Sequence, residues 1–346
     1  MGNGKNMKIG IDCRLINETG VGRYTRNLVE ELQKQDKKNT YVLIKTDIKW
    51  HTLKEQLIFP WIIWRKKCDL VHFPYFSIPV FYPGKFIVTI HDLIINHFDT
   101  GRASTKNIFI YKGKRWFYLL IIWLVAHRAC KIITVSESTK REIVEHLGIK
   151  PEKVVVTYEG VTLDQKSKIK NQNESPYFLY VGNAYPHKNL EKLILAFNKI
   201  QNSKLVLVGK EDYFYRRLKE HINKKKIENI IFYNEATDKE LVYLYQHATA
   251  LIHPSLMEGF GLTIVEAMAN GCLVACADIP SLREITGGHA LFFDPNSTED
   301  MKNKMEQAIS MNYDDMRKKA KEWVKKYSWG KMGEETKKIY ENCLGL

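Results

Sequence analysis

Short apolar runs alternate with amphipathic segments along most of this 346-residue chain. Apolar runs bounded by Gly or Pro are typical of buried strands, whereas apolar residues that recur every three or four positions indicate helices. The predicted strands are 8–13, 41–45, 69–73, 86–90, 131–135, 151–158, 177–181, 204–208, 230–233, 248–253 and 273–277. This alternation predicts an α/β fold in which helices cover parallel sheets.

Apolar residues at helical spacing lie between and after these strands. The predicted helices are 25–33, 137–145, 190–200, 238–245, 264–269, 298–309, 314–327 and 332–343. Residues 165–175 are polar and without a periodic pattern, so we interpret them as a linker between two Rossmann-like domains, 1–164 and 176–328. Residues 329–346 form a separate C-terminal helix.

The stretch 248–277 predicts a strand, a glycine loop, a helix and a second strand, which together make a βαβ unit. Gly259 and Gly261 let the backbone approach a ligand closely, and the amides of residues 260–263 open the helix, where an anion is favoured. A carboxylate repels phosphate, so Glu258 and Glu266 are better placed to bind sugar or ribose hydroxyls. The alternative is that Glu266 only favours the helix start and Glu258 is solvated.

The spacing of these carboxylates resembles the donor-binding signature of retaining GT-B glycosyltransferases of family 4, the glycogen-synthase-like group. The signature is two Glu separated by seven residues, here Glu258 and Glu266, around Gly259, Phe260 and Gly261. The resemblance implies two Rossmann-like domains facing each other across a cleft, an acceptor-side first domain and a last helix that crosses back to it. It implies that the loop binds the nucleotide-sugar through Glu258, Gly259, Phe260, Gly261, Leu262, Thr263 and Glu266.

Three other segments are similar to the same family. Gly22 lies in a glycine loop, 19–24, which in relatives faces the donor phosphate and the transferred sugar. His91 ends the strand 86–90, where the family's His contacts the transferred sugar. Lys188 stands at a helix entrance, placed to meet the donor diphosphate.

The family usually pairs this Lys with an Arg just after the preceding strand, but here that position is Asn183. This exchange resembles the mannosyltransferase-like bacterial subgroup, and it leaves more of the charge to Lys188. Gly209 and Lys210 supply a second diphosphate contact. The backbone at Glu235 and Ala236 lies where relatives hold the nucleotide base.

The candidate catalytic residues are His91, Glu258 and Lys188. No Asp-x-Asp occurs in the chain, so we expect no metal and no other cofactor. The negative charge that leaves with the nucleoside diphosphate must then be stabilised by Lys188 and helix N-termini. The resemblance implies retention through front-face attack, in which the leaving phosphate helps to remove the acceptor proton.

The formal charge is +14, and residues 1–164 contribute +10 of it, from 26 basic and 16 acidic residues. Two segments, 57–67 and 108–116, mix Trp, Tyr and Phe with Lys and Arg, which suits an anionic membrane surface. The alternative is that both segments are core and the charge is solvated. The uninterrupted apolar run 116–126 is too short to span a bilayer, and we expect it to form a core helix. Nucleic acid is not an expected partner, because no reading motif accompanies the charge.

Six cysteines occur without a CxxC pair, and we interpret them as buried thiols in a reducing compartment. The N-terminus has no apolar signal region. We therefore expect a cytoplasmic protein, peripheral on the inner face of the plasma membrane if the basic aromatic surface is real.

Three functions remain open. The first is retaining transfer of a hexose from a GDP- or UDP-sugar to a glycan or lipid-linked acceptor in surface polysaccharide synthesis. The second is a GT-B nucleotide-sugar epimerase, which would turn over the donor without an acceptor. The third is a non-catalytic, basic membrane-binding protein, which would not need Glu258, Glu266, Lys188 and His91 together.

Overall fold

The structure is a computed structural model that describes residues 6–18, 20–50, 52–94, 108–161 and 176–345; for 108–115 and 117 it describes the backbone alone. The described residues divide into two compact units. Unit 1 consists of residues 6–93, 108–160 and 327–345, and unit 2 of Ile94, Val161 and residues 176–326. The predicted linker, 165–175, lies outside the described residues.

Unit 1 contains a six-stranded parallel sheet in the order β2-β1-β3-β4-β5-β6. The strands are β1 Lys8–Asp12, β2 Thr40–Ile44, β3 Leu70–Phe73, β4 Phe86–Ile90, β5 Ile132–Thr134 and β6 Val154–Val156. Every residue of β3, β4 and β5 is buried, which explains their continuous apolar runs. The sixth strand is shorter than predicted because residues 151–153 form a 3₁₀ turn that begins at Pro151.

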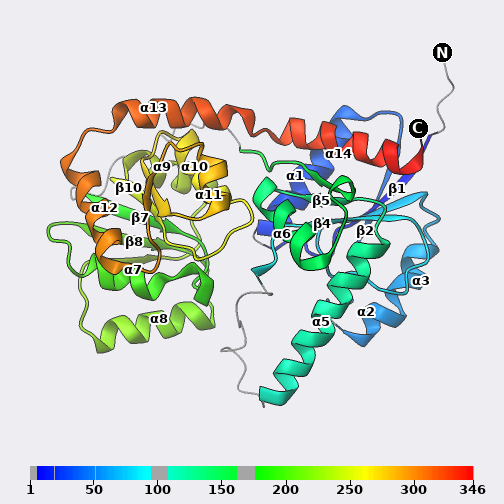
Figure 1. The fold of residues 1–346 in the computed structure, drawn as a ribbon, viewed down its shortest axis with the longest axis horizontal. Helices are drawn as coiled ribbons and strands as arrows, with labels where there is room; N and C mark the ends of the chain where they lie inside the picture. The colour runs from blue at the N-terminus through cyan, green and yellow to red at the C-terminus, as the bar shows by residue number, and fades with distance from the viewer. Residues whose placement is uncertain (1–5, 19, 51, 95–107, 162–175, 346) are drawn as a thin grey trace. The chain divides into compact units, whose positions relative to one another are not determined.

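The helices of unit 1 are α1 Gly20–Gln35, α2 Leu53–Leu57, α3 Phe59–Trp64, α5 Ile108–Arg128, α6 Glu137–Leu147 and α14 Trp329–Leu344. The first begins earlier than predicted, so the expected glycine loop 19–24 falls largely within its first turn. A Cβ on Gly22 would lie 2.7 Å from the carbonyl oxygen of Ile16, so Gly22 lets α1 pack against the preceding segment. Helix α14 packs against α1 although the two are far apart in sequence (Figure 1).

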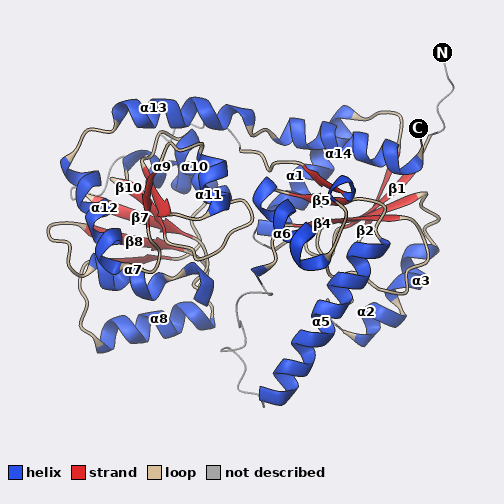
Figure 2. Cartoon of the chain, viewed as in Figure 1, coloured by secondary structure: helices blue, strands red, loops and turns tan. Residues whose placement is uncertain are grey.

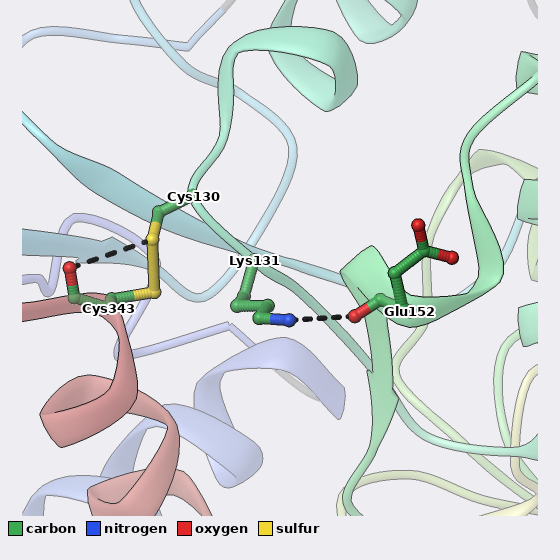
Figure 3. Close-up of a disulfide and its surroundings, with 4 residues drawn as sticks. All are labelled: Cys130, Lys131, Glu152 and Cys343. Atoms are coloured by element: carbon green, nitrogen blue, oxygen red, sulfur yellow. Dashed lines mark hydrogen bonds between the residues drawn. A yellow bond between two sulfur atoms is a disulfide. The ribbon is translucent and has the colours of Figure 1, made fainter. Parts of the chain in front are cut away.

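Cys130 and Cys343 form a disulfide that joins α14 to the segment between α5 and β5 (Figure 3). The expectation that all six cysteines are thiols is therefore wrong for this pair. The two residues are 213 positions apart, so no local spacing could indicate the bond. Cys13, Cys272 and Cys276 are buried thiols as expected, and Cys68 is a half-buried thiol.

Unit 2 contains a second six-stranded parallel sheet, in the order β12-β11-β10-β7-β8-β9. Its strands are β7 Tyr177–Val181, β8 Lys204–Val208, β9 Ile230–Tyr233, β10 Ala250–His253, β11 Val274–Ala277 and β12 Leu291–Phe293. Its helices are α7 Leu190–Phe197, α8 Tyr213–Lys224, α9 Asp238–His247, α10 Leu262–Ala269, α11 Pro280–Thr286, α12 Thr298–Ser310 and α13 Asp314–Trp323. They cover both faces of the sheet (Figure 2).

In each sheet, successive strands of the chain are added first toward one edge and then toward the other, so the order of strands reverses once. In unit 1 the reversal lies between β1 and β3, and in unit 2 between β7 and β10. Loops that leave the carboxyl ends of the two strands at such a point diverge and leave a crevice, where open α/β sheets bind ligands. The order of strands thus indicates one candidate site in each unit.

The apolar segments of unit 1 are only partly core. Helix α3 buries Phe59 and Ile63 but exposes Trp61 and Trp64, so the interpretation of 57–67 as wholly core is wrong. Helix α5 buries Ile122, Val125 and Ala126, as a core helix does, but exposes Trp116 and Trp123. None of the helices in the described part of the chain is long and apolar enough to cross a membrane.

Candidate functional site

The loops that follow β7 and β10 are fastened to each other at the reversal point of unit 2. The amide of Leu256, after β10, donates to the carbonyl of His187, after β7, over 2.8 Å. The side-chain amide of Asn189 donates to the carbonyls of Pro254 (3.2 Å) and Pro295 (2.7 Å). Asn189 has φ +59°, in the left-handed region that Asn tolerates better than most residues. These bonds fix the positions of the charged residues that the two loops carry.

Lys188 and Glu258 meet at this point and form an ion pair between the two loops. Their side chains are 15 % and 10 % exposed, so the pair is largely shielded from water. Burial alone would raise the pKa of the Glu258 carboxyl, but the ammonium of Lys188 and a bond from His253 hold that pKa well below its usual value. Glu258 is therefore an ionised carboxylate, and Lys188 is the cation that faces it.

His253, the last residue of β10, orients this carboxylate. Its Nε2 lies 2.7 Å from Glu258 Oε1 and donates to it, and its Nδ1 lies 3.5 Å from the hydroxyl of Thr263. Sequence reasoning missed His253 as a site residue. The available signal was its place at the carboxyl end of a parallel strand, five residues before Glu258.

Helix α10 begins beside this pair. Gly261 precedes it with φ +88°, a left-handed conformation that suits Gly, and the carbonyl of Gly261 accepts the first helical bond, from Ile264. The amides of Leu262 and Thr263 belong to the first turn, where helical amides have no partner within the helix. Gly259, Phe260 and Gly261 form a glycine loop that connects β10 to α10 as predicted, whereas Leu262 and Thr263, predicted as part of that loop, already belong to the helix.

Glu266 lies one turn further along α10 and is buried. Its Oε2 accepts a hydrogen bond from the hydroxyl of Tyr245 over 3.1 Å, which ties α10 to α9. This contact gives Glu266 a structural partner in addition to the role predicted for it.

The remaining predicted donor residues of unit 2 lie on neighbouring loops. Asn183 follows β7, and its carbonyl accepts from the hydroxyl of Tyr180 over 2.6 Å. A Cβ on Gly209 would lie 2.1 Å from the carbonyl oxygen of Gly182, so the loops after β7 and β8 touch there. Lys210 is the next residue and is exposed.

Glu235 and Ala236 follow β9, which is separated from β7 by β8 in the sheet. The structure thus places them beyond the loop of Lys188, toward the sheet edge. Glu235 has φ +44°, and the next residues, Thr237 and Glu240, form a capping box that starts α9.

In unit 1, His91 follows β4 and is held from both sides. Its Nδ1 lies 3.1 Å from Glu159 Oε1, and its Nε2 lies 3.0 Å from the carbonyl oxygen of Pro74. Both partners are acceptors, so the protonated ring, which has a donor on each nitrogen, satisfies both of them. Burial alone would lower the pKa of His91, but Glu159 and Pro74 raise it above its ordinary value. In its protonated form the ring can donate hydrogen bonds but cannot act as a general base.

Two family models match adjacent parts of the chain: one described as Glycosyltransferase Family 4 matches residues 48–165, and one described as Glycosyl transferases group 1 matches residues 162–326. The O-antigen chain mannosyltransferase RfbU of Salmonella typhimurium is 30 % identical over 52 % of this chain and 51 % of its own length. The chain thus spans about half the length of this curated relative.

Solved structures are similar over nearly the whole chain. Sucrose-phosphate synthase of Thermosynechococcus elongatus superimposes with a TM-score of 0.80 and 16 % identity, covering 98 % of this chain and 100 % of that one. HepE of Anabaena, in complex with UDP-glucose, gives a TM-score of 0.79 and 16 % identity over 97 % and 100 %. At this level of identity these likenesses show the fold, which is GT-B.

Proposed function

The chain belongs to the family 4 glycosyltransferases, and from this premise we propose that it is a retaining hexosyltransferase that uses a GDP- or UDP-sugar. The observation that carries the proposal is the group formed by Lys188, Glu258 and His253 at the reversal point of unit 2, beside the start of α10. A cation and helical amides suit a diphosphate, and an ionised carboxylate suits sugar hydroxyls.

The contacts of Lys188 and Glu258 leave each of them capacity for a ligand. An ammonium has three N–H donors, and among the residues that the structure describes one of them meets Glu258, so two remain for diphosphate oxygens. Within the described part of the chain, the bonds from Lys188 and His253 both end on Glu258 Oε1, which leaves Oε2 for a hydroxyl of the hexose. Asn183 supplies no charge, so Lys188 and the α10 amides carry the diphosphate charge without a metal.

The relatives support the cellular role that we propose. RfbU is named an O-antigen chain mannosyltransferase, and HepE was solved with UDP-glucose. We infer a glycan or lipid-linked acceptor in surface polysaccharide synthesis, with a mannose donor as the first to test. Among nucleotide-sugars in a thermal-shift screen, GDP- or UDP-hexoses should stabilise the protein, and product analysis with the best donor should then show transfer. Turnover of the donor to an epimer without an acceptor would favour an isomerase and reject the proposal.

We also propose that unit 1 binds an anionic membrane through the surface of α2 and α3. Leu57, Trp61, Trp64 and Phe81 line one apolar groove, and the last three are 64 %, 58 % and 70 % exposed. Directly after α3, residues 65–67 are Arg, Lys and Lys, and all three are exposed. Each cation near an anionic leaflet contributes about 1 kcal/mol, and inserted aromatic rings add to it. The side chains of Lys112, Lys114 and Arg115, in the second predicted segment, lie outside the described residues.

Vesicle sedimentation tests this surface. Wild-type protein should pellet with anionic vesicles at low salt and be released as salt screens the charges. Reversing residues 65–67 to Glu should abolish binding, whereas the matched reversal of Lys224, Lys225 and Lys226, which are exposed in unit 2, should not. Equal loss in both triple variants would point to net charge alone, and wild-type protein that stays in the supernatant would reject the membrane surface.

A further inference from the structure

A cavity of about 230 Å³ opens at the reversal point of the unit 1 sheet. Its walls come from the segments that follow β1, β2 and β3, which is where a ligand is expected in an open α/β sheet. The cavity is smaller than the ~300–1,000 Å³ that is typical of sites for drug-sized ligands. One of its lining residues, Pro74, is the residue whose carbonyl accepts from His91, so the cavity adjoins the candidate catalytic histidine.

The inner wall is rigid because Arg14 is bonded on three sides. Its Nε lies 3.0 Å from Asp12 Oδ1, one terminal nitrogen lies 2.8 Å from Glu55 Oε1, and the other lies 3.0 Å from the carbonyl oxygen of Ser77. The guanidinium also lies over the ring of Phe59, 3.9 Å from its centroid. The segments after β1 and β3 are thereby held in one arrangement, and the charge of Arg14 is matched by two carboxylates.

The charges that remain favour hydroxyl groups over phosphate. Three acidic residues, Asp12, Glu18 and Asp47, line the cavity, against Arg14 and Lys49. Since Arg14 is paired with Asp12 and Glu55, the charge that remains at the mouth comes from Glu18 and Asp47 against Lys49 and is net negative. Ionised carboxylates accept hydrogen bonds from hydroxyls and repel phosphate oxygens. This separates the cavity from the site of unit 2, where Lys188 and the start of α10 favour a diphosphate.

Trp50 gives the mouth an aromatic wall. Its side chain is 43 % exposed, and its ring centroid lies 6.1 Å from that of Tyr75, which lines the same cavity. A broad aromatic face beside acceptor groups suits a ring that is apolar on its faces and carries hydroxyls on its rim. A pyranose has that character.

We propose that this cavity binds one neutral pyranose unit, with Asp47 accepting from its hydroxyls and Trp50 packing on its face. The inference deepens the proposed function, because a glycosyltransferase needs a place for its sugar acceptor, and it assigns that place to residues after β1, β2 and β3. Asp12, Arg14 and Glu55 hold the wall of the cavity in place and do not determine which ligand binds.

Fluorine NMR of protein labelled with 5-fluorotryptophan tests the assignment. The chain has seven Trp, and Trp50→Phe identifies the resonance of Trp50. Methyl pyranosides of gluco, galacto and manno configuration are titrated in the millimolar range without any donor. At least one should shift the Trp50 resonance, and Asp47→Asn should weaken that sugar about tenfold, as expected for one bond to a charged acceptor. Glu30→Gln and Trp123→Phe, exposed positions of unit 1 that do not line the cavity, should leave the affinity unchanged.

The outcomes distinguish this inference from the proposed function. If no pyranoside moves Trp50 while calorimetry still detects nucleotide-sugar binding, the cavity proposal is wrong and the donor site stands. If inorganic phosphate moves Trp50 and the sugars do not, the ligand class is wrong. Sugar binding at Trp50 in a protein that binds no nucleotide-sugar would support the cavity and reject the transferase.

Discussion

Separating Lys188 from Glu258 should reveal how strongly the two loops of unit 2 depend on their ion pair. Both side chains are largely buried, so removing one partner leaves the other charge shielded from water and unmatched. Breaking a buried pair in this way costs about 3–5 kcal/mol. We expect Lys188→Met to lower the free energy of unfolding of unit 2 by about 3 kcal/mol. Glu258→Gln should cost about 2 kcal/mol, because the amide oxygen keeps an acceptor for His253.

The double variant, which combines Lys188→Met with Glu258→Gln, measures the coupling between the two charges. Once both charges are gone, neither is left unmatched, so the cost of the double variant should fall short of the summed single costs by at least ~1 kcal/mol. The experiment belongs near pH 7. The depressed pKa of Glu258 means that the stabilisation is present above the unfolded carboxyl pKa of about 4.3 and is lost as the pH falls through the folded value.

Trp323 makes this measurement specific to unit 2. It is the single Trp between residues 161 and 326, and its indole donates to the carbonyl of Ile285 over 2.9 Å. Its fluorine resonance in 5-fluorotryptophan protein therefore follows the urea unfolding of this unit alone, which matters because a chain of two units need not unfold in one step. Single costs that add within about 0.5 kcal/mol would refute the coupling that we infer between Lys188 and Glu258.

Three further predictions concern other parts of the account. The pair of His91 with Glu159 should stabilise unit 1 below the unfolded His pKa of about 6.5 and cease to do so as the pH rises through the raised pKa of His91. In urea titrations, the loss of unfolding free energy caused by Glu159→Gln should therefore shrink from acidic to alkaline pH. A loss that does not change with pH would contradict the charged ring. Glu266→Ala should weaken nucleoside diphosphate binding by about 1–3 kcal/mol in calorimetry, and unchanged affinity would remove Glu266 from the site. Turnover should persist in excess chelator, since Lys188 and helical amides are proposed to carry the charge; loss that added metal reverses would show that they do not.

The strands of the sheets could be predicted because a buried parallel strand has a continuous run of apolar residues in its sequence. The bounds of β4, β7, β8 and β9 agree with the predicted ranges. The start of α1 could not be predicted, because Gly20 and Gly22 are typical of a loop in sequence and become helical only when Gly22 packs against the carbonyls before it. The disulfide of Cys130 and Cys343 depends on the docking of α14, which no local pattern encodes.

The site shows the same division. Glu258 and Lys188 could be singled out from loop motifs, and the structure brings them together. Their partners could not be found in this way. His253 ends an otherwise apolar strand five residues before Glu258, and only the fold shows that its ring meets that carboxylate. Glu159 lies 68 residues after His91, so their contact arises only when the sheet is formed.

The central claim, retaining transfer from a nucleotide-sugar held by Lys188, is tested most directly by proton NMR of the first product formed from the best GDP- or UDP-hexose. The one-bond coupling between the anomeric carbon and its hydrogen reports whether the product keeps the configuration of the donor. The account predicts an α-product from an α-donor, formed in the presence of chelator and at a rate at least about tenfold lower in Lys188→Met, since the leaving diphosphate loses its cation. A β-product, or an α-product formed equally fast by Lys188→Met, would contradict it.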